Sequence, residues 1–206
     1  MELLTELRHR KVLAIIRADG PDRALDCVRT LVDAGITALE VSLTTPGGVD
    51  AIAKARSEYD PNILIGAGTV VTAAQADEVA AAGAGFVVTP AITRGAHRSV
   101  DLGLPLLCGA LTPTEVVAAL DLGATAVKIF PAKVYGPSYF RELRAPLPEA
   151  PLLAVGGVDA QTAPEYLAAG ALAVGVGSPL LGDAGTGGSL SALADRAAGF
   201  RATLGV

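Results

Sequence analysis

A single lysine, Lys128, lies inside an apolar segment with several β-branched residues, residues 125–132, that follows Gly123. This pattern is typical of a buried strand in a parallel sheet. Burying an ammonium costs several kcal/mol and favours the neutral amine. A neutral amine can attack a ketone and form a Schiff base, so Lys128 is a candidate nucleophile. The alternative is a lysine at the end of the strand that pairs with a carboxylate.

Two more charged residues, Arg17 and Glu40, occur at or near apolar segments of the same kind. Side chains alternate along a strand, so residues two apart share a face. On this basis Arg17 continues the face of Leu13 and Ile15, Glu40 shares a face with Ala38 and Ser42, and Lys128 shares one with Ala126 and Phe130. If these faces meet in one interior, an arginine, a glutamate and a lysine converge there. A buried ion-pair network with only a structural role remains the alternative.

Glycine clusters provide a second candidate site. Gly156 and Gly157 follow the apolar segment 152–155, and Gly177 and Ser178 follow the segment 171–175. Bare backbone amides can approach an anion closely, and barrel enzymes often bind phosphate at the loops after strands 7 and 8. The alternative is that both clusters are tight turns. The segment 66–68 is more typical of a close-packed barrel rim, after which Thr69 could point a hydroxyl into the site.

The elements that must position these residues follow a repeating pattern. Glycines at 35, 83, 103, 123 and 170 are each placed to end a helix immediately before an apolar segment. Further boundaries at residues 60–62 and 148–151 complete the series. The pattern predicts eight strands, in residues 12–16, 36–41, 63–65, 84–88, 104–108, 125–132, 152–155 and 171–175. It predicts helices at 21–34, 46–58, 72–82, 93–102, 112–122, 137–144, 160–169 and 189–203.

Eight alternating strand–helix units predict an α/β fold, a (β/α)8 TIM barrel with an extra N-terminal helix, formed by residues 1–206 as one domain. A doubly wound open sheet is the alternative. That architecture usually has fewer strands and a glycine-rich first turn, which is absent after Ile16. In a barrel the chemistry is expected at the carboxyl ends of the strands.

Composition limits the classes of partner. Of the 206 residues 51% are hydrophobic and 4% aromatic, and the formal net charge is −5, which gives no basic surface for nucleic acid. No apolar run reaches the roughly 18 residues of a membrane span. Residues 1–11 are charged and lack the apolar centre of a signal peptide. Cys27 and Cys108 form no metal or redox motif and are expected to be buried free thiols in a reducing cytoplasm.

Six motifs in order along the chain resemble the KDPG/KHG aldolase family, and the resemblance runs from about Val12 to Leu181. Its members are class I aldolases for 2-keto-3-deoxy-6-phosphogluconate, 2-keto-3-deoxy-6-phosphogalactonate and 4-hydroxy-2-oxoglutarate. The motifs are Leu39–Val41, Ile65–Val70, Val88–Pro90, Lys128–Pro131, Val155–Val158 and Gly175–Ser178. Together they are far more specific than any one of them.

The resemblance implies a role for each matching residue. Lys128 would be the Schiff-base nucleophile and Glu40 the general acid and base. Arg17 and Thr69 would lie near the pyruvyl carboxylate, Pro90 and Phe130 along the pocket wall, and Gly156, Gly157, Gly177 and Ser178 around the phosphate. Such aldolases use neither a metal nor another cofactor and are typically homotrimers. The products would be pyruvate and glyceraldehyde 3-phosphate, or pyruvate and glyoxylate from 4-hydroxy-2-oxoglutarate.

Two positions depart from the gluconate-type pattern. Where many such members carry an arginine after strand 2, this chain has Ser42 to Thr45, so carboxylate binding is expected to fall to Arg17. Val155 replaces a common threonine and is similar to the galactonate type, which leaves the preferred epimer open. The rival functions are a phosphate-binding barrel isomerase or synthase, and a non-catalytic sugar-phosphate-binding barrel in which Lys128 and Glu40 form an ion pair.

Overall fold

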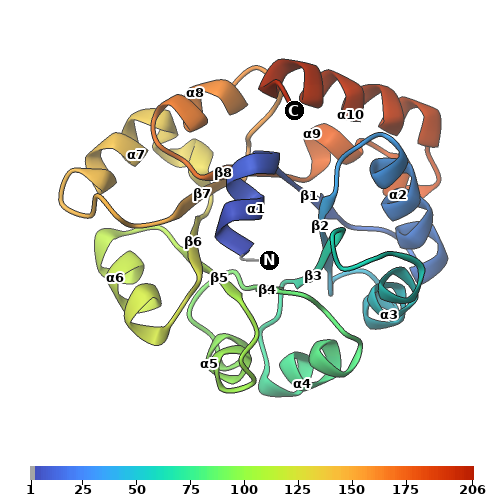
Figure 1. Ribbon diagram of the computed structural model, residues 1–206, viewed down its shortest axis with the longest axis horizontal. Helices are drawn as coiled ribbons and strands as arrows, with labels where there is room; N and C mark the ends of the chain where they lie inside the picture. The colour runs from blue at the N-terminus through green and yellow to red at the C-terminus, as the bar shows by residue number, and fades with distance from the viewer. Residues whose placement is uncertain (1–2) are drawn as a thin grey trace.

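The computed structural model describes residues 3–206, and eight parallel strands in it close into a barrel in which each strand pairs with its sequence neighbours and β8 pairs with β1. Figure 1 looks down this barrel, with helices around the ring of strands. The strands are β1 (Val12–Ile16), β2 (Ala38–Ser42), β3 (Leu64–Gly68), β4 (Val87–Val88), β5 (Leu106–Ala110), β6 (Ala126–Ile129), β7 (Leu152–Val155) and β8 (Ala173–Val176). The predicted (β/α)8 barrel is therefore confirmed, and the open-sheet alternative is excluded.

The helices form the outer layer, apart from α1 (Leu3–Arg10), which lies across one end of the barrel (Figure 1). This is the predicted extra N-terminal helix. The others are α2 (Pro21–Asp33), α3 (Gly48–Glu58), α4 (Ala73–Ala81), α5 (Arg94–Asp101), α6 (Pro113–Leu122), α7 (Gly136–Arg144), α8 (Ala163–Ala168), α9 (Ser178–Leu181) and α10 (Leu190–Leu204), with 3-10 turns η1 (Ala132–Val134) and η2 (Ala184–Thr186). Within residues 3–206, none of these helices combines the length and the apolar character needed to cross a bilayer.

Two separate apolar clusters show which way the strand side chains face. The smaller cluster fills the barrel interior and includes Leu13, Ile15, Ala38 and Ala126, closed below by Leu3 and Leu7 of α1. The larger cluster lies between strands and helices and includes Val12, Ala14, Leu39, Val41, Val127 and Ile129. The alternation predicted for β1, β2 and β6 is therefore confirmed. Glu40 and Lys128 belong to the inward set.

The five predicted helix-ending glycines all have left-handed backbones, with φ between 72° and 101°. In each case the glycine N–H donates to the carbonyl three residues back, and the next N–H donates to the carbonyl five residues back. This is the Schellman arrangement, which satisfies the last carbonyls of a helix. Any other residue would be strained at such a φ, so the glycine repeat marks the helix ends reliably.

The predicted starts of several strands were wrong by two or three residues. Strands β2, β4, β5 and β8 begin at residues 38, 87, 106 and 173, not at 36, 84, 104 and 171. The cause is the same at each place: the apolar residue after the glycine, such as Ile36 or Ala84, still bonds back to the helix. Its hydrophobic character reflects packing at the helix end and not strand pairing.

Strand β3 extends beyond its predicted end, because Gly66 and Gly68 lie inside it and not on a rim after it. Both glycines have an inward position, where a side chain would overlap the ring of Phe86 at Gly66 and the carboxyl group of Glu40 at Gly68. Small residues in one strand thus make room for large ones in its neighbours, as is common in barrel interiors. This packing determines where the Glu40 side chain can lie.

Candidate active site

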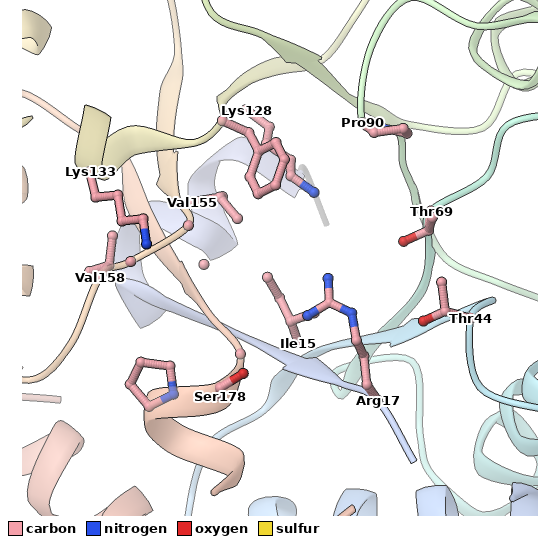
Figure 2. A pocket seen from close by; sticks show the side chains of 16 residues that line it. Ile15, Arg17, Thr44, Thr69, Pro90, Lys128, Lys133, Val155, Val158 and Ser178 are labelled. Carbon is pink, nitrogen blue, oxygen red and sulfur yellow. The ribbon is translucent and has the colours of Figure 1, made fainter. Parts of the chain in front are cut away.

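A cavity of about 410 Å³ opens at the carboxyl ends of the strands. Ten of the eleven predicted site residues line it, together with Ile15, Thr44, Lys133, Val158, Gly175 and Pro179. The ten are Arg17, Thr69, Pro90, Lys128, Phe130, Val155, Gly156, Gly157, Gly177 and Ser178. Figure 2 shows the Lys128 amine, the Arg17 guanidinium and the hydroxyls of Thr69 and Thr44 directed toward one central space. The structure thus brings together residues from seven of the eight strand ends.

Lys128 is only 5% exposed, and its ammonium faces the cavity from the middle of the barrel wall. It lies over the ring of Phe130, 5.2 Å from the ring centroid, which is a cation–π distance. On the neighbouring strand it is in register with Gly109, where a side chain would overlap the backbone of Pro90. Within residues 3–206 its Nζ atom makes no hydrogen bond or ion pair with the protein. The amine is therefore both buried and free to react.

Glu40 is the one predicted site residue that does not line the cavity, since it lies one side-chain layer deeper on β2 than Ser42. Its side chain is 1% exposed, and neither carboxyl oxygen has a partner among the described residues. Burial raises the pKa of this carboxyl group above its usual value, and the positive charges of Lys128 and Arg17 oppose that shift. Glu40 is thus a carboxyl group within electrostatic reach of Lys128 whose hydrogen bonds remain uncommitted.

The buried ion-pair network that was the alternative explanation for Arg17, Glu40 and Lys128 does not form among residues 3–206. The ion pairs there join residues on helices α1 to α5, and none includes Arg17, Glu40 or Lys128. An unpaired buried charge is costly, so such groups are retained mainly where chemistry uses them. The argument applies to Glu40 and Lys128, which are buried, whereas Arg17 is exposed at the mouth of the barrel.

Placing a methyl group at Gly68 should displace the Glu40 carboxyl group, because the added Cβ would overlap it. We expect Gly68→Ala to lower the free energy of unfolding by about 1–3 kcal/mol. We also expect kcat to fall about 10²-fold, since a small misplacement of a catalytic group has that effect. Chemical denaturation and steady-state kinetics would measure the two changes.

The matched control is Gly199→Ala, the same substitution on the exposed side of α10. A Cβ there meets nothing within 4 Å, so stability should stay the same or rise by up to about 1 kcal/mol, with activity unchanged. Equal effects of the two substitutions would contradict the position assigned to Glu40.

Three hydroxyl groups form a chain along the mouth of the barrel. The Ser42 Oγ atom lies 2.9 Å from Thr44 Oγ1 and 3.0 Å from Thr69 Oγ1. Thr69 has a φ of 62°, a left-handed conformation that is rare and strained for a β-branched residue. With this backbone conformation the Thr69 hydroxyl points into the cavity (Figure 2). Strained residues of this kind gather at functional sites.

The glycine turns form the opposite wall. Gly156 and Gly157 have φ values of 95° and 78°; a Cβ at Gly156 would crowd the ring of Phe130, and one at Gly157 would overlap the side chain of Lys133. Gly177 lies against the guanidinium of Arg17, with 3.3 Å from its Cβ position to Nη1. Backbone amides and the Ser178 hydroxyl are thus accessible beside two cationic side chains, Arg17 and Lys133. An anionic group fits this end of the cavity.

Sequence reasoning missed two polar residues of the cavity wall, Thr44 and Lys133. Thr44 was considered only as part of the segment Ser42 to Thr45, where many gluconate-type members carry an arginine, and it was not predicted to line the site. Lys133 had a usable signal, because it lies two residues after Pro131 and five after Lys128, immediately beyond the carboxyl end of the strand. Its side chain points back over the cavity because Gly157 leaves room for it.

Comparison with known proteins gives one consistent result. The model of the KDPG and KHG aldolase family matches residues 3–186. The chain is 38% identical over 191 residues to 2-dehydro-3-deoxy-6-phosphogalactonate aldolase of Escherichia coli K12, covering 92% of each chain. It is 36% identical to 2-dehydro-3-deoxy-phosphogluconate aldolase of Pseudomonas aeruginosa, covering 80% of this chain and 75% of the relative.

Among solved structures it is similar to KDPG aldolase from Legionella pneumophila with pyruvate captured at low pH as a covalent carbinolamine intermediate. The TM-score is 0.86 at 28% identity, over 95% of this chain and 96% of the other. The family match covers most of the chain, and the fold and the cavity described above agree with it. This chain belongs to the KDPG and KHG aldolase family.

Proposed function

We propose that this protein is a class I aldolase that cleaves a phosphorylated 2-keto-3-deoxy sugar acid to pyruvate and glyceraldehyde 3-phosphate. The substrate is the galactonate or the gluconate epimer, and 4-hydroxy-2-oxoglutarate is a further substrate that yields pyruvate and glyoxylate. The observation that carries the proposal is the unpaired Lys128 amine, buried in the wall of a cavity with an uncommitted carboxyl group beneath it. The named activities of the relatives and the covalent pyruvate adduct in one of them support it.

The reaction begins when the neutral amine of Lys128 attacks the C2 ketone and the carbonyl oxygen takes up a proton. Glu40 carries protons during carbinolamine formation and the loss of water, which leaves a protonated imine. A carboxyl group whose pKa is raised by burial suits this role, because it holds its proton more readily than an ordinary glutamate and can give that proton to the departing hydroxyl. The imine then accepts the electron pair released at C3.

Bond cleavage follows when the C4 hydroxyl proton is removed, with Glu40 acting through a water molecule. The C3–C4 bond breaks, the aldehyde leaves, and the electron pair of the broken bond stays on C3 and forms the double bond of an enamine with the imine carbon C2. The enamine is protonated at C3, and water hydrolyses the resulting imine. Pyruvate is released and the Lys128 amine is restored.

The remaining residues hold the substrate. Arg17 pairs with the pyruvyl carboxylate, and the Thr69 hydroxyl donates to it. Pro90, Phe130 and Val155 form the apolar wall along the carbon chain. The amides of the glycine turns, together with the Ser178 hydroxyl, hold the phosphate. These roles rest on the position of each residue in the cavity and on the family motifs that carry them.

A substrate panel tests the proposal. Pyruvate release would be measured with the two phosphorylated epimers and with 4-hydroxy-2-oxoglutarate. We expect turnover of both epimers, with the galactonate form preferred, because Val155 matches that type and the galactonate relative aligns over more of the chain. Absence of pyruvate release from all three substrates would show that the proposal is wrong.

We further propose that the enzyme is a cytoplasmic homotrimer. Cys27 and Cys108 are free and buried, as predicted, and burial raises the pKa of Cys27 to about 11, which suits unreactive thiols in a reducing compartment. Val134 and Tyr135 are apolar or aromatic residues that are more than half exposed, so they are available for a subunit contact. Light scattering on the purified protein would give the number of subunits.

A further inference from the structure

Lys133 occupies a distinctive place at the rim of the cavity. Its backbone N–H donates to the Gly156 carbonyl at 3.1 Å, which fixes η1 against the first glycine turn. Its side-chain stem then crosses the face of Gly157, whose missing side chain leaves the space. Figure 2 shows the ammonium extending along this turn beside Val158, on the cavity side. The position is therefore held by backbone bonding and by packing, although the side chain itself is exposed.

The ammonium of Lys133 has no competing partner among residues 3–206. It takes part in none of the ion pairs or side-chain hydrogen bonds of that part of the chain. The described residues that line the cavity include no aspartate or glutamate, whereas they include Arg17, Lys128 and Lys133. The cavity wall is thus positively charged, and it suits an anion with more than one charged group.

The charges of the proposed substrate can be matched to these three cations. The substrate has a carboxylate at one end and a phosphate that carries about −1.5 to −2 at the other. Lys128 is consumed in forming the imine, and Arg17 pairs with the carboxylate. Backbone amides supply hydrogen bonds to the phosphate but no net charge. Lys133, beside the Gly156–Gly157 turn, is the cation that remains for it.

We infer that Lys133 is a specificity-determining residue that pairs with the substrate phosphate and selects phosphorylated over unphosphorylated keto-deoxy acids. The inference rests on the proposed function, and it adds a charged contact to a site otherwise made of backbone amides and one hydroxyl. A lysine on a four-carbon stem acts as a point charge and tolerates some variation in phosphate position. It therefore contributes affinity for the dianion more than shape selectivity.

Lys133→Met tests the charge while keeping most of the apolar stem over Gly157. We expect kcat/KM for the phosphorylated acid to fall about tenfold to a hundredfold, the usual worth of a charge-assisted hydrogen bond. For unphosphorylated 2-keto-3-deoxy acid the value should stay within about twofold of wild type. Lys133→Arg should restore most of the loss. The matched control is Lys54→Met on α3, where Lys54 pairs with Asp22 on the outer surface.

Binding of inorganic phosphate gives a second readout that needs no turnover. Calorimetric titration should show at least tenfold weaker phosphate binding to Lys133→Met than to wild type and to Lys54→Met. Equal phosphate binding, or equal losses with phosphorylated and unphosphorylated acids, would overturn the inference. If phosphate binding depends on Lys133 while wild type releases no pyruvate from any keto acid, the phosphate contact of Lys133 stands, and the proposed aldolase function fails together with the selection among keto acids.

Discussion

Lys128→Ala is expected to lower kcat at least about 10⁴-fold, because the covalent intermediate can no longer form. The amine lies in the cavity wall, 5% exposed, and has no hydrogen-bond or ion-pair partner among residues 3–206 whose loss would otherwise explain the effect. Removing an unpaired buried ammonium should leave the protein at least as stable as wild type. Thermal unfolding followed by circular dichroism, together with steady-state pyruvate release, would measure both properties.

Lys54→Ala is the control for this substitution. Lys54 lies on the outer surface of α3, pairs with Asp22 at 3.0 Å and is about half exposed, so its loss should change stability by less than about 1 kcal/mol. Activity should remain at the wild-type level. If Lys128→Ala retained most of its activity, the imine mechanism would be wrong even if the substrate panel succeeded.

Glu40→Gln is the substitution with the second large expected effect. We expect kcat to fall about 10²- to 10⁴-fold because general acid–base catalysis is lost. The glutamine amide has nearly the same shape as the glutamate carboxyl group, so it should fit over Gly68 without moving strand β3. Substrate binding should change little, since Glu40 does not line the cavity. A variant that loses kcat but keeps KM would separate the loss of proton transfer from the loss of binding. An unchanged kcat would assign the protons to another group.

The same substitution should also change how stability depends on pH. Burial raises the folded-state pKa of Glu40 above its usual value of 4.5, so the folded protein holds this proton more tightly than the unfolded chain. The resulting stabilisation is present below the unfolded-state pKa and is lost as the pH rises through the folded-state pKa. Glu40→Gln should remove that decline. Denaturation midpoints of wild type and Glu40→Gln, measured between about pH 4 and 8, would reveal the difference. If the midpoints of the two proteins changed with pH in the same way, the raised pKa of Glu40 would be contradicted.

Much of this architecture was predictable because its signals are local. A glycine that must adopt a left-handed conformation identifies the end of a helix from a single residue, and the pattern recurs at Gly35, Gly83 and Gly123. Strict alternation in β1, β2 and β6 identifies the inward faces before any fold is known. Since every parallel strand directs its carboxyl end to one side, Arg17 and Lys128 had to meet there.

The features that the sequence did not reveal depend on contacts between distant segments. The depth of Glu40 follows from Gly68 on the next strand, and the orientation of Lys133 follows from Gly157 after β7. Ala84 lies outside strand β4 because its N–H donates to the carbonyl of Val79 in α4, and hydrophobicity alone cannot distinguish such a helix-end residue from a paired strand residue. The left-handed backbone of Thr69 has no local signal, since a β-branched residue disfavours that conformation.

The most direct test of the central proposal is reduction with borohydride in the presence of pyruvate, followed by peptide mapping. We expect the mass of one reduced pyruvyl group per chain on the peptide that contains Lys128, and no such mass in Lys128→Ala. Glu40→Gln should form the adduct more slowly but on the same residue. An unmodified Lys128, or an adduct on Lys133 instead, would contradict the assignment of this buried amine as the nucleophile.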